Sequence, residues 1–213
     1  MTKRFRVILL IVFCVLSFSS ASSAEGKRPI RIGFGFGTGK QPFFPFSSPD
    51  YSYKVQGYKI LLNYRIKESG TFCYELQAEP GIYFADHRLL NEFFIQPKAG
   101  TDYLELRKRF TAEKRITEYV LNIGFQVRMC LNQKWSLFVL GSIGPMISDT
   151  QTERLAKGFA FSDIIAAGVA FKTRRVLFEL RPGLRHVSNA NLQKPNGGHN
   201  SSNIDFGISI SLW

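Results

Sequence analysis

The sequence predicts an all-β protein, an eight-stranded antiparallel outer-membrane β-barrel, and three observations lead to this fold class. Apolar and polar residues alternate with period two along most of the chain. The connections between the alternating segments are short and long in turn. The chain also opens with a stretch typical of an exported protein and ends on an aromatic residue, Trp213.

Residues 1–24 have the features of a cleaved signal peptide. Three basic residues among the first six precede an apolar run of about a dozen residues, too short for a membrane-spanning helix of roughly 20. Small serine and alanine residues follow and end at Ala24, after which we expect cleavage. The remaining residues, 25–213, are enough for a single domain.

The composition is strongly basic, with 28 lysines and arginines against 16 acidic residues and a formal net charge of +12. Loss of the leader removes three basic residues and no acidic ones, so a charge of +9 remains. Basic chains often bind nucleic acid, but for an exported chain the anionic outer membrane of a Gram-negative bacterium is the better partner. We therefore expect a membrane and a lipopolysaccharide partner, and no nucleic acid.

Eight segments carry the alternation expected of strands. In 118–131 the apolar residues occupy odd positions and mostly polar residues occupy the even ones, whereas in 58–67 the apolar positions are even. The predicted strands lie near 30–37, 58–67, 72–84, 118–131, 135–146, 159–172, 175–188 and 203–213. No segment after the leader approaches 18 consecutive apolar residues, so helical spans are not predicted.

The connections are predicted to be short near 67–70, 132–134 and 173–174, and long near 38–52, 86–115, 147–157 and 189–202. Short turns at one end and long loops at the other are typical of outer-membrane barrels, with both termini in the periplasm. A soluble β-sandwich also alternates, but the inward face, rich in Glu, Gln, Arg, Asn and Gly, favours the interior of a small barrel. Within 86–115, residues 103–110 fit either a strand extension or a short helix.

Two cysteines remain after the leader. Cys73 lies near the start of one predicted strand and Cys130 near the end of its antiparallel neighbour, so both are expected at the periplasmic end with side chains facing inward. The oxidising periplasm permits a disulfide between them, and two free thiols are the other possibility.

The residues that suggest chemistry lie at the end of the seventh predicted strand, in Leu184-Arg185-His186-Val187-Ser188-Asn189-Ala190. His186 and Ser188 are two residues apart and therefore share one face of the strand, with Cα atoms about 6–7 Å apart. An imidazole at this spacing can activate a serine hydroxyl. His-x-Ser alone is common by chance, and a structural surface pair is the alternative.

Strand parity predicts which way this pair points. His186 and Ser188 continue the apolar, lipid-facing positions of the strand, which are Val176, Phe178, Leu180 and Leu184. Polar groups at lipid-facing positions of the outer rim are unexpected in a purely structural barrel. They suit an ester bond held in the outer leaflet.

Together with the downstream Pro195-Asn196-Gly197-Gly198, these residues resemble the PagL-type lipid A 3-O-deacylase family. The resemblance implies a serine esterase that removes the 3-O acyl chain of lipid A, without a metal or cofactor. Ser188 would be the nucleophile and His186 the general base of a Ser, His, Glu triad. The resemblance places the acid fourteen residues after the histidine, where this chain has Asn200.

Asn200 departs from the pattern because an amide can orient an imidazole but cannot stabilise its charged form as a carboxylate does. Strand parity puts Asn200 on the same outer face as His186 and Ser188. The oxyanion donors are expected next to the nucleophile, at Asn189 and Ala190, since developing negative charge needs preorganised N–H groups.

Two function classes remain at this point. The first is a lipid A deacylase acting in the outer membrane. The second is a non-catalytic structural or adhesive barrel that keeps the scaffold and has lost activity through the change at Asn200. A small pore is disfavoured because side chains fill the interior of an eight-stranded barrel.

Overall fold

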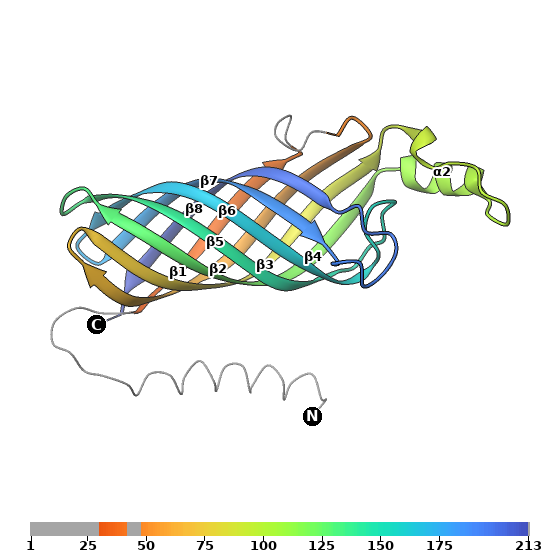
Figure 1. The fold of residues 1–213 in the computed structure, drawn as a ribbon. Coiled ribbons are helices and arrows are strands. Elements are labelled where there is room, and N and C mark those ends of the chain that lie inside the picture. Colours follow the sequence, from red (N-terminus) through yellow and green to blue (C-terminus); the bar gives the residue numbers. More distant parts are fainter. Residues whose placement is uncertain (1–29, 42–47, 213) are drawn as a thin grey trace, which may run out of the picture.

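The computed structural model describes residues 30–41 and 48–212, which form one closed barrel of eight antiparallel strands (Figure 1). Their bounds are β1 Ile30–Lys40, β2 Tyr51–Ser69, β3 Phe72–Leu89, β4 Lys114–Cys130, β5 Trp135–Ser148, β6 Gly158–Thr173, β7 Val176–Ser188 and β8 His199–Ser211. Each strand pairs with its neighbours in sequence, and β1 pairs with β8 to close the ring. The predicted fold class is confirmed and the sandwich is excluded. The predicted signal peptide and Trp213 lie outside the described residues.

The two ends of the barrel differ as predicted. Turns at 70–71, 131–134 and 174–175 form a short-turn end. The end of β1, the start of β2 and the connections 90–113, 149–157 and 189–198 lie at the opposite, long-loop end. The segment 90–113 holds a 3-10 helix, η2 (Glu92–Phe94), and a helix, α2 (Tyr103–Thr111), which projects beyond the barrel (Figure 1). The carboxylate of Asp102 caps α2 by accepting from the Glu105 N–H at 3.0 Å. In the described part of the chain, no helix has the length and apolar character needed to cross a membrane.

Several strands extend further toward the long-loop end than the alternation predicted. β2 begins at Tyr51 instead of near residue 58, and β3 runs to Leu89 instead of 84. In this upper part of β2 the outward residues are polar, as at Lys54, while the buried inward residues are aromatic, as at Tyr53. The apolar parity is therefore reversed above the lipid-facing band, so the outward apolar alternation ends before the strand does.

A band of apolar side chains covers the outer wall. Ile32, Phe34, Ile60, Leu76, Tyr119, Phe125, Ile143, Ile165, Phe206 and Ile208 are all exposed. Ile165, on β6, is 74% exposed, a high value for an isoleucine within a strand. A continuous apolar outer wall is the surface that a barrel presents to lipid.

The interior is filled by charged side chains in ion pairs. The inward, buried charged residues of the strands are Arg31, Lys59, Arg128, Arg181 and Arg185 and the carboxylates Glu75, Glu79, Glu118, Glu179 and Asp205. Arg31 pairs with both oxygens of Glu75 at 2.6 and 2.8 Å, and Lys59 pairs with Asp205 at 2.6 Å. The barrel therefore has a packed ionic core, as expected for eight strands.

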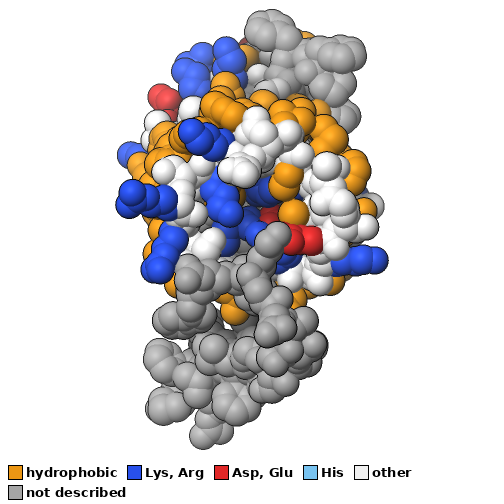
Figure 2. Space-filling view, turned by 90° about the vertical axis from the view of Figure 1, so that its left-hand side faces the viewer, with side chains coloured by type: hydrophobic (Ala, Val, Ile, Leu, Met, Phe, Trp, Pro, Cys, Tyr) orange, Lys and Arg blue, Asp and Glu red, His pale blue; other side chains and the backbone are white. Residues whose placement is uncertain are grey.

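The short-turn end is basic and contains both cysteines. A cavity of about 480 Å³ opens there, and Arg65, Lys134 and Lys172 are among its lining residues. Figure 2, which looks onto this end, shows lysine and arginine side chains around the rim and inside the opening. Cys73 and Cys130 lie together at the short-turn end, in line with their predicted position at one barrel end, and both line this cavity. Their Sγ atoms are 3.9 Å apart and both thiols are free.

Candidate active site

The strand ends that carry the site are the last residues of β7 and the first of β8, at the long-loop end. The inward residues of β7 here, Arg185 and Val187, are 2% and 1% exposed. His186 is exposed and Ser188 is half-buried, and both lie on the outer face between these inward positions. The predicted orientation of the His186–Ser188 pair is thus what the structure has.

His186 and Asn200 face each other directly across β7 and β8. Nδ1 of His186 lies 2.6 Å from Oδ1 of Asn200. With Oδ1 as the acceptor, Nδ1 carries the proton and Nε2 keeps the lone pair that a general base needs. The Asn200 backbone N–H donates to the Tyr51 hydroxyl at 3.3 Å, which holds the start of β8 against β2.

Ser188 shares the outer face with His186 but makes no hydrogen bond to it within the described structure. Ser188 lies directly opposite Phe161 on β6, one outward position nearer the loop end than His186. A spacing of two along a strand separates the Cα atoms by about 6–7 Å, a gap that the two side chains can span. Catalytic hydrogen bonds are often long in substrate-free sites and shorten on binding.

Gly198 closes the site on the loop side. Its φ of +64° lies in the left-handed region, and a Cβ there would be 2.4 Å from the Val187 carbonyl oxygen. The same Cβ would be 3.2 Å from His186 Cε1 and 3.5 Å from Ser188 Cβ. Glycine at this position therefore lets the loop backbone pack directly against the histidine and the serine.

Asn189, which the sequence suggested as an oxyanion donor, instead forms hydrogen bonds within the loop that follows β7. Its backbone N–H donates to Asn196 Oδ1 at 2.7 Å, and its amide Nδ2 donates to the carbonyls of Gln193 and Pro195 at 3.0 and 3.2 Å. Asn189 is fully buried. Its donors are occupied in shaping the loop, so they do not point to a substrate on the outer face.

Ala190, the other suggested donor, differs from Asn189. It is exposed and has a φ of +50°, and Asn191 follows at +67°. These left-handed residues turn the chain sharply just after Ser188. Its N–H has no hydrogen-bond acceptor in the part of the chain that the structure describes, so it stays the candidate oxyanion donor.

Arg154, which the sequence analysis did not single out, holds the site loop from the neighbouring loop 149–157. Its guanidinium donates to the carbonyls of Gly198 and Gly197 at 2.8 and 3.0 Å. Its own carbonyl accepts from both of their N–H groups. The guanidinium also lies over the Tyr51 ring, 4.6 Å from the centroid. No local motif marks Arg154, because its partners are more than 40 residues away.

The loop that carries Arg154 is fixed at its start by Asp149. The carboxylate accepts from the Thr117 backbone N–H at 2.8 Å and from the Thr150 hydroxyl at 2.7 Å. Burial raises the pKa of Asp149, but these hydrogen bonds outweigh burial and hold the pKa below its ordinary value. Asp149 is therefore ionised at neutral pH, and the anchor persists there.

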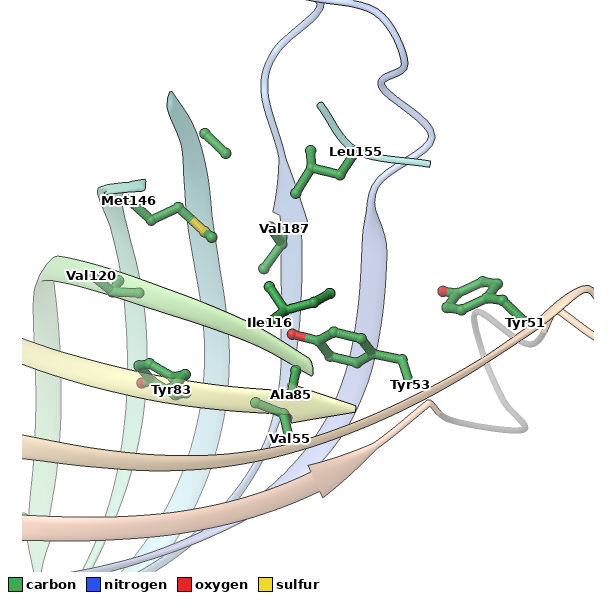
Figure 3. Packing of buried hydrophobic residues seen from close by; sticks show 11 residues of the cluster. Tyr51, Tyr53, Val55, Tyr83, Ala85, Ile116, Val120, Met146, Leu155 and Val187 are labelled. Atoms are coloured by element: carbon green, nitrogen blue, oxygen red, sulfur yellow. The ribbon is translucent and has the colours of Figure 1, made fainter. Parts of the chain in front are cut away.

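The lumenal side of the site is packed. A buried cluster fills the barrel behind it, and Val187 from β7 and Leu155 from the loop both belong to this cluster (Figure 3). Arg185 pairs with Glu118 at 2.8 Å and donates to the Ser162 hydroxyl at 2.9 Å. Because these inward contacts alternate with the outward residues, they fix the backbone from which His186 and Ser188 project.

A shallow apolar groove of about 580 Å³ approaches the site along the outer wall, over β3 to β6. Phe125, Ile143 and Ile165 line it, and Asp163 lies at its β6 side, next to β7. Gly141 forms part of its floor, where a Cβ would meet no atom within 4 Å. The groove therefore exists because this outward position has no side chain.

The sequence matches the model of one known protein family. The model of the family PagL, described as lipid A 3-O-deacylase, matches residues 56–209, a span that contains His186, Ser188 and Asn200. The chain belongs to the PagL family. At the level of the family, this membership supports lipid A deacylation at the outer membrane. It agrees with the resemblance noted from the site residues.

Solved structures agree on the fold of this PagL-family chain. The crystal structure of the outer membrane enzyme PagL is 15% identical with a TM-score of 0.50, covering 81% of this chain and 97% of that one. Neisserial surface protein A is 13% identical with a TM-score of 0.50, covering 88% and 100%. Identities this low indicate an outer-membrane barrel fold and no more. No curated protein matches the chain.

Proposed function

We propose that this PagL-family protein hydrolyses the 3-O-linked acyl ester of lipid A in the outer leaflet of the outer membrane. Ser188 is the nucleophile, His186 the general base, and Asn200 the group that orients the imidazole. The observation that carries the proposal is the 2.6 Å contact between His186 Nδ1 and Asn200 Oδ1 on the outer wall of the barrel. A histidine with its tautomer fixed, two residues from an outward serine, is arranged for acyl transfer.

The reaction proceeds in two halves. Ser188 Oγ attacks the ester carbonyl while His186 Nε2 takes the hydroxyl proton, and the Ala190 N–H stabilises the oxyanion that forms. The intermediate collapses as His186 returns the proton to the leaving 3-hydroxyl of the sugar. Water, activated by the same imidazole, then attacks the acyl-enzyme, which releases the hydroxy fatty acid and restores Ser188.

The groove along β3 to β6 suits the hydrocarbon part of this substrate. Apart from Ser142 and Asp163, its lining residues are apolar or glycine, and the groove ends beside the strand that carries His186. An acyl chain lying in it would deliver its ester end to the rim, where Ser188 lies. The outer leaflet supplies such chains from the same side.

A basic row at the rim suits the anionic headgroup. Lys40 and Lys54 are directly opposite on β1 and β2, and Lys40 is also opposite Ser202, two residues after Asn200 on β8. Both lysines line a cavity of about 550 Å³ together with Arg115 and one acid, Asp86, which lies opposite Lys54 on one side and Arg115 on the other. Asp86 offsets the charges of Lys54 and Arg115 in part, whereas Lys40 faces only Lys54 and Ser202 across its two neighbouring strands. A phosphate beside Lys40 would relieve the repulsion between the two lysines.

A non-catalytic barrel is the second candidate. Two observations favour it, namely the neutral Asn200 in the place of an acid and the absence of a Ser188–His186 hydrogen bond in the described structure. A shared barrel fold does not separate the two classes, since unrelated functions occur on one scaffold.

Mass spectrometry of lipid A tests the proposal. Cells that express the protein should lose one ester-linked hydroxyacyl chain from lipid A, and cells that express Ser188→Ala in equal amount should not. Fragmentation of the product should assign the loss to the 3-position. Unchanged lipid A with the folded wild-type protein would favour the non-catalytic barrel, and a loss from another position would retain the esterase but change its regiochemistry.

A further inference from the structure

Asp163 is an acidic residue on the lipid-facing side of β6. The outward residues before and after it along the strand are Phe161 and Ile165, and Ile143 lies directly opposite on β5. Three of the four outward neighbours of Asp163, along its strand and across the sheet, are therefore aliphatic or aromatic. Ionisable side chains at lipid-facing positions are energetically costly and commonly have a functional role.

The fourth neighbour of Asp163 is His186. The two residues face each other directly across β6 and β7, as His186 and Asn200 do across β7 and β8. Asp163, His186 and Asn200 thus form one row over three adjacent strands, with the imidazole in the middle. Directly opposed residues have Cβ atoms about 4.5–5.5 Å apart, so the carboxylate lies within electrostatic reach of the ring.

Among the residues that the structure describes, no hydrogen-bond donor or cation pairs with the Asp163 carboxylate. Oδ1 of Asp163 is buried and has no hydrogen-bond partner among the described residues. None of the ion pairs in that part of the chain involves Asp163. No described cation therefore neutralises the carboxylate, and its charge remains available to act on the neighbouring His186.

The orientation of the imidazole makes this charge useful. Asn200 engages Nδ1, so the opposite edge of the ring, with Nε2 and Cδ2, turns away from β8 toward the β6 side. Nε2 is the atom that takes the serine proton in the proposed reaction. Asn200 is neutral and leaves the resulting positive charge without a counter-charge on its own side.

We infer that Asp163 is a positioning residue that supplies the negative charge missing at Asn200. The inference rests on the proposed function of Ser188 and His186. When Ser188 attacks, its hydroxyl proton moves to Nε2 and the imidazole becomes a cation, and the Asp163 carboxylate stabilises this cation through space. Asp163 exchanges no proton. The Asn200 amide thus orients the imidazole from one side, and the Asp163 carboxylate stabilises its charge from the other. In a Ser, His, acid triad a single carboxylate performs both tasks.

Four proteins test this role: the wild type, Asp163→Asn, Asn200→Glu and the double variant. Two readouts are needed, kcat and KM on purified lipid A and the rate at which a long-chain alkyl fluorophosphonate labels Ser188. Asp163→Asn should lower kcat and the labelling rate about tenfold or more, with KM almost unchanged. In the Asn200→Glu background the same change should cost about threefold or less, because a second carboxylate then faces the ring.

Controls separate this role from a structural one. Glu105→Gln removes one negative charge from α2, away from the site, and should leave both rates unchanged. Asp163→Glu should retain a large part of the labelling rate. If Asp163→Asn does not fold, as judged by heat-modified gel mobility, Asp163→Ser in the same two backgrounds takes its place.

Each result has a definite reading. Equal losses from Asp163→Asn in both backgrounds, or an unchanged labelling rate, would overturn the inference. A wild-type protein in which Ser188 is never labelled would overturn it together with the nucleophile. Labelling that depends on Asp163 without lipid A deacylation would support the inference and remove only lipid A as the substrate.

Discussion

His186 Nδ1 and Asn200 Oδ1 lie 2.6 Å apart at directly paired positions of β7 and β8. The pairing register of β7 with β8 brings them together, because these two strands flank the loop 189–198 and residues fourteen apart in the chain lie opposite each other there. The side chain that orients the imidazole is therefore held by the sheet itself, and its chemical identity can be changed with little effect on the fold.

Substitutions at Asn200 should separate orientation from charge. Asn200→Ala should lower deacylation about tenfold, because the imidazole loses its orienting acceptor while Ser188 and His186 remain. Asn200→Glu should hold or raise the rate. Initial rates on lipid A, beside the inactive Ser188→Ala, provide the measurement. A silent Asn200→Ala would leave the nucleophile and base in place and remove only the third role.

Gly198→Ala should lower the activity without unfolding the barrel. A Cβ at Gly198 would lie 2.4 Å from the Val187 carbonyl oxygen and would push the loop away from His186. We expect a loss of about tenfold or more in activity, since small displacements of reacting groups are costly. Gly70→Ala is the matched control, with a similar φ of +59° and no atom within 4 Å of the added Cβ. Equal activity of the two variants would contradict this account of Gly198.

Gly141→Leu should impair the enzyme only toward long acyl chains. The leucine would fill the floor of the outer-wall groove, because nothing now occupies that space. Deacylation of lipid A should fall about tenfold, while hydrolysis of a short-chain p-nitrophenyl ester should be unaffected. Ala167→Leu adds an isopropyl group, nearly the same bulk, to an outward position of β6 that does not line the groove. If Gly141→Leu behaves like Ala167→Leu on both substrates, the acyl chain lies elsewhere.

Cys73 and Cys130 should form a disulfide on mild oxidation. Their Sγ atoms are 3.9 Å apart as free thiols, and 57 positions separate them in sequence. A bridge closing a loop of this length would stabilise the barrel by about 4 kcal/mol if the geometry is unstrained. Intact mass and non-reducing electrophoresis after oxidation measure it, with Cys73→Ser as the control. Two titratable thiols after oxidation would exclude the bridge.

Glu75→Gln should destabilise the barrel far more than Glu68→Gln. Glu75 is fully buried, accepts two hydrogen bonds from Arg31 and lies 3.4 Å from Arg128, so its loss leaves two buried guanidinium groups short of a counter-charge. The expected cost is about 3–5 kcal/mol. Glu68 pairs with Arg65 at a more exposed position, where such a pair contributes about 0–1 kcal/mol. Urea unfolding in lipid vesicles would measure both, and equal midpoints would contradict the ionic-core interpretation.

The fold and the face of the site could be predicted because period-two alternation is a direct consequence of strand geometry. The positions of His186, Ser188 and Asn200 on the outer wall follow from parity alone, and the register of β7 with β8 agrees. The upper parts of the strands could not be predicted in the same way. There, outward residues such as Lys54 meet water or headgroups, and inward residues such as Tyr53 pack in the lumen, so the apolar parity changes sides.

The loop contacts of the site could not be predicted either. Asn189 looks available in the sequence, but its donors are used by Asn196, Gln193 and Pro195, and this depends on how the loop closes on itself. Asp163 did carry a signal, since it is an acid at an outward position between Phe161 and Ile165. Its meaning becomes clear only when β6 is set in register beside His186.

The contacts of Arg154 limit how this site can be transferred to another protein. The segment 184–200 consists of the end of one strand, a loop and the start of the next strand. A continuous segment of this kind could be moved as one piece onto any eight-stranded barrel. Yet its loop is bonded on both donor and acceptor sides to Arg154, whose guanidinium rests on Tyr51 of a third segment. A transplant without those two residues would carry the nucleophile and base but not the support that positions them. An engineered or evolved exchange of activity between such barrels must therefore move three separate pieces of chain at once.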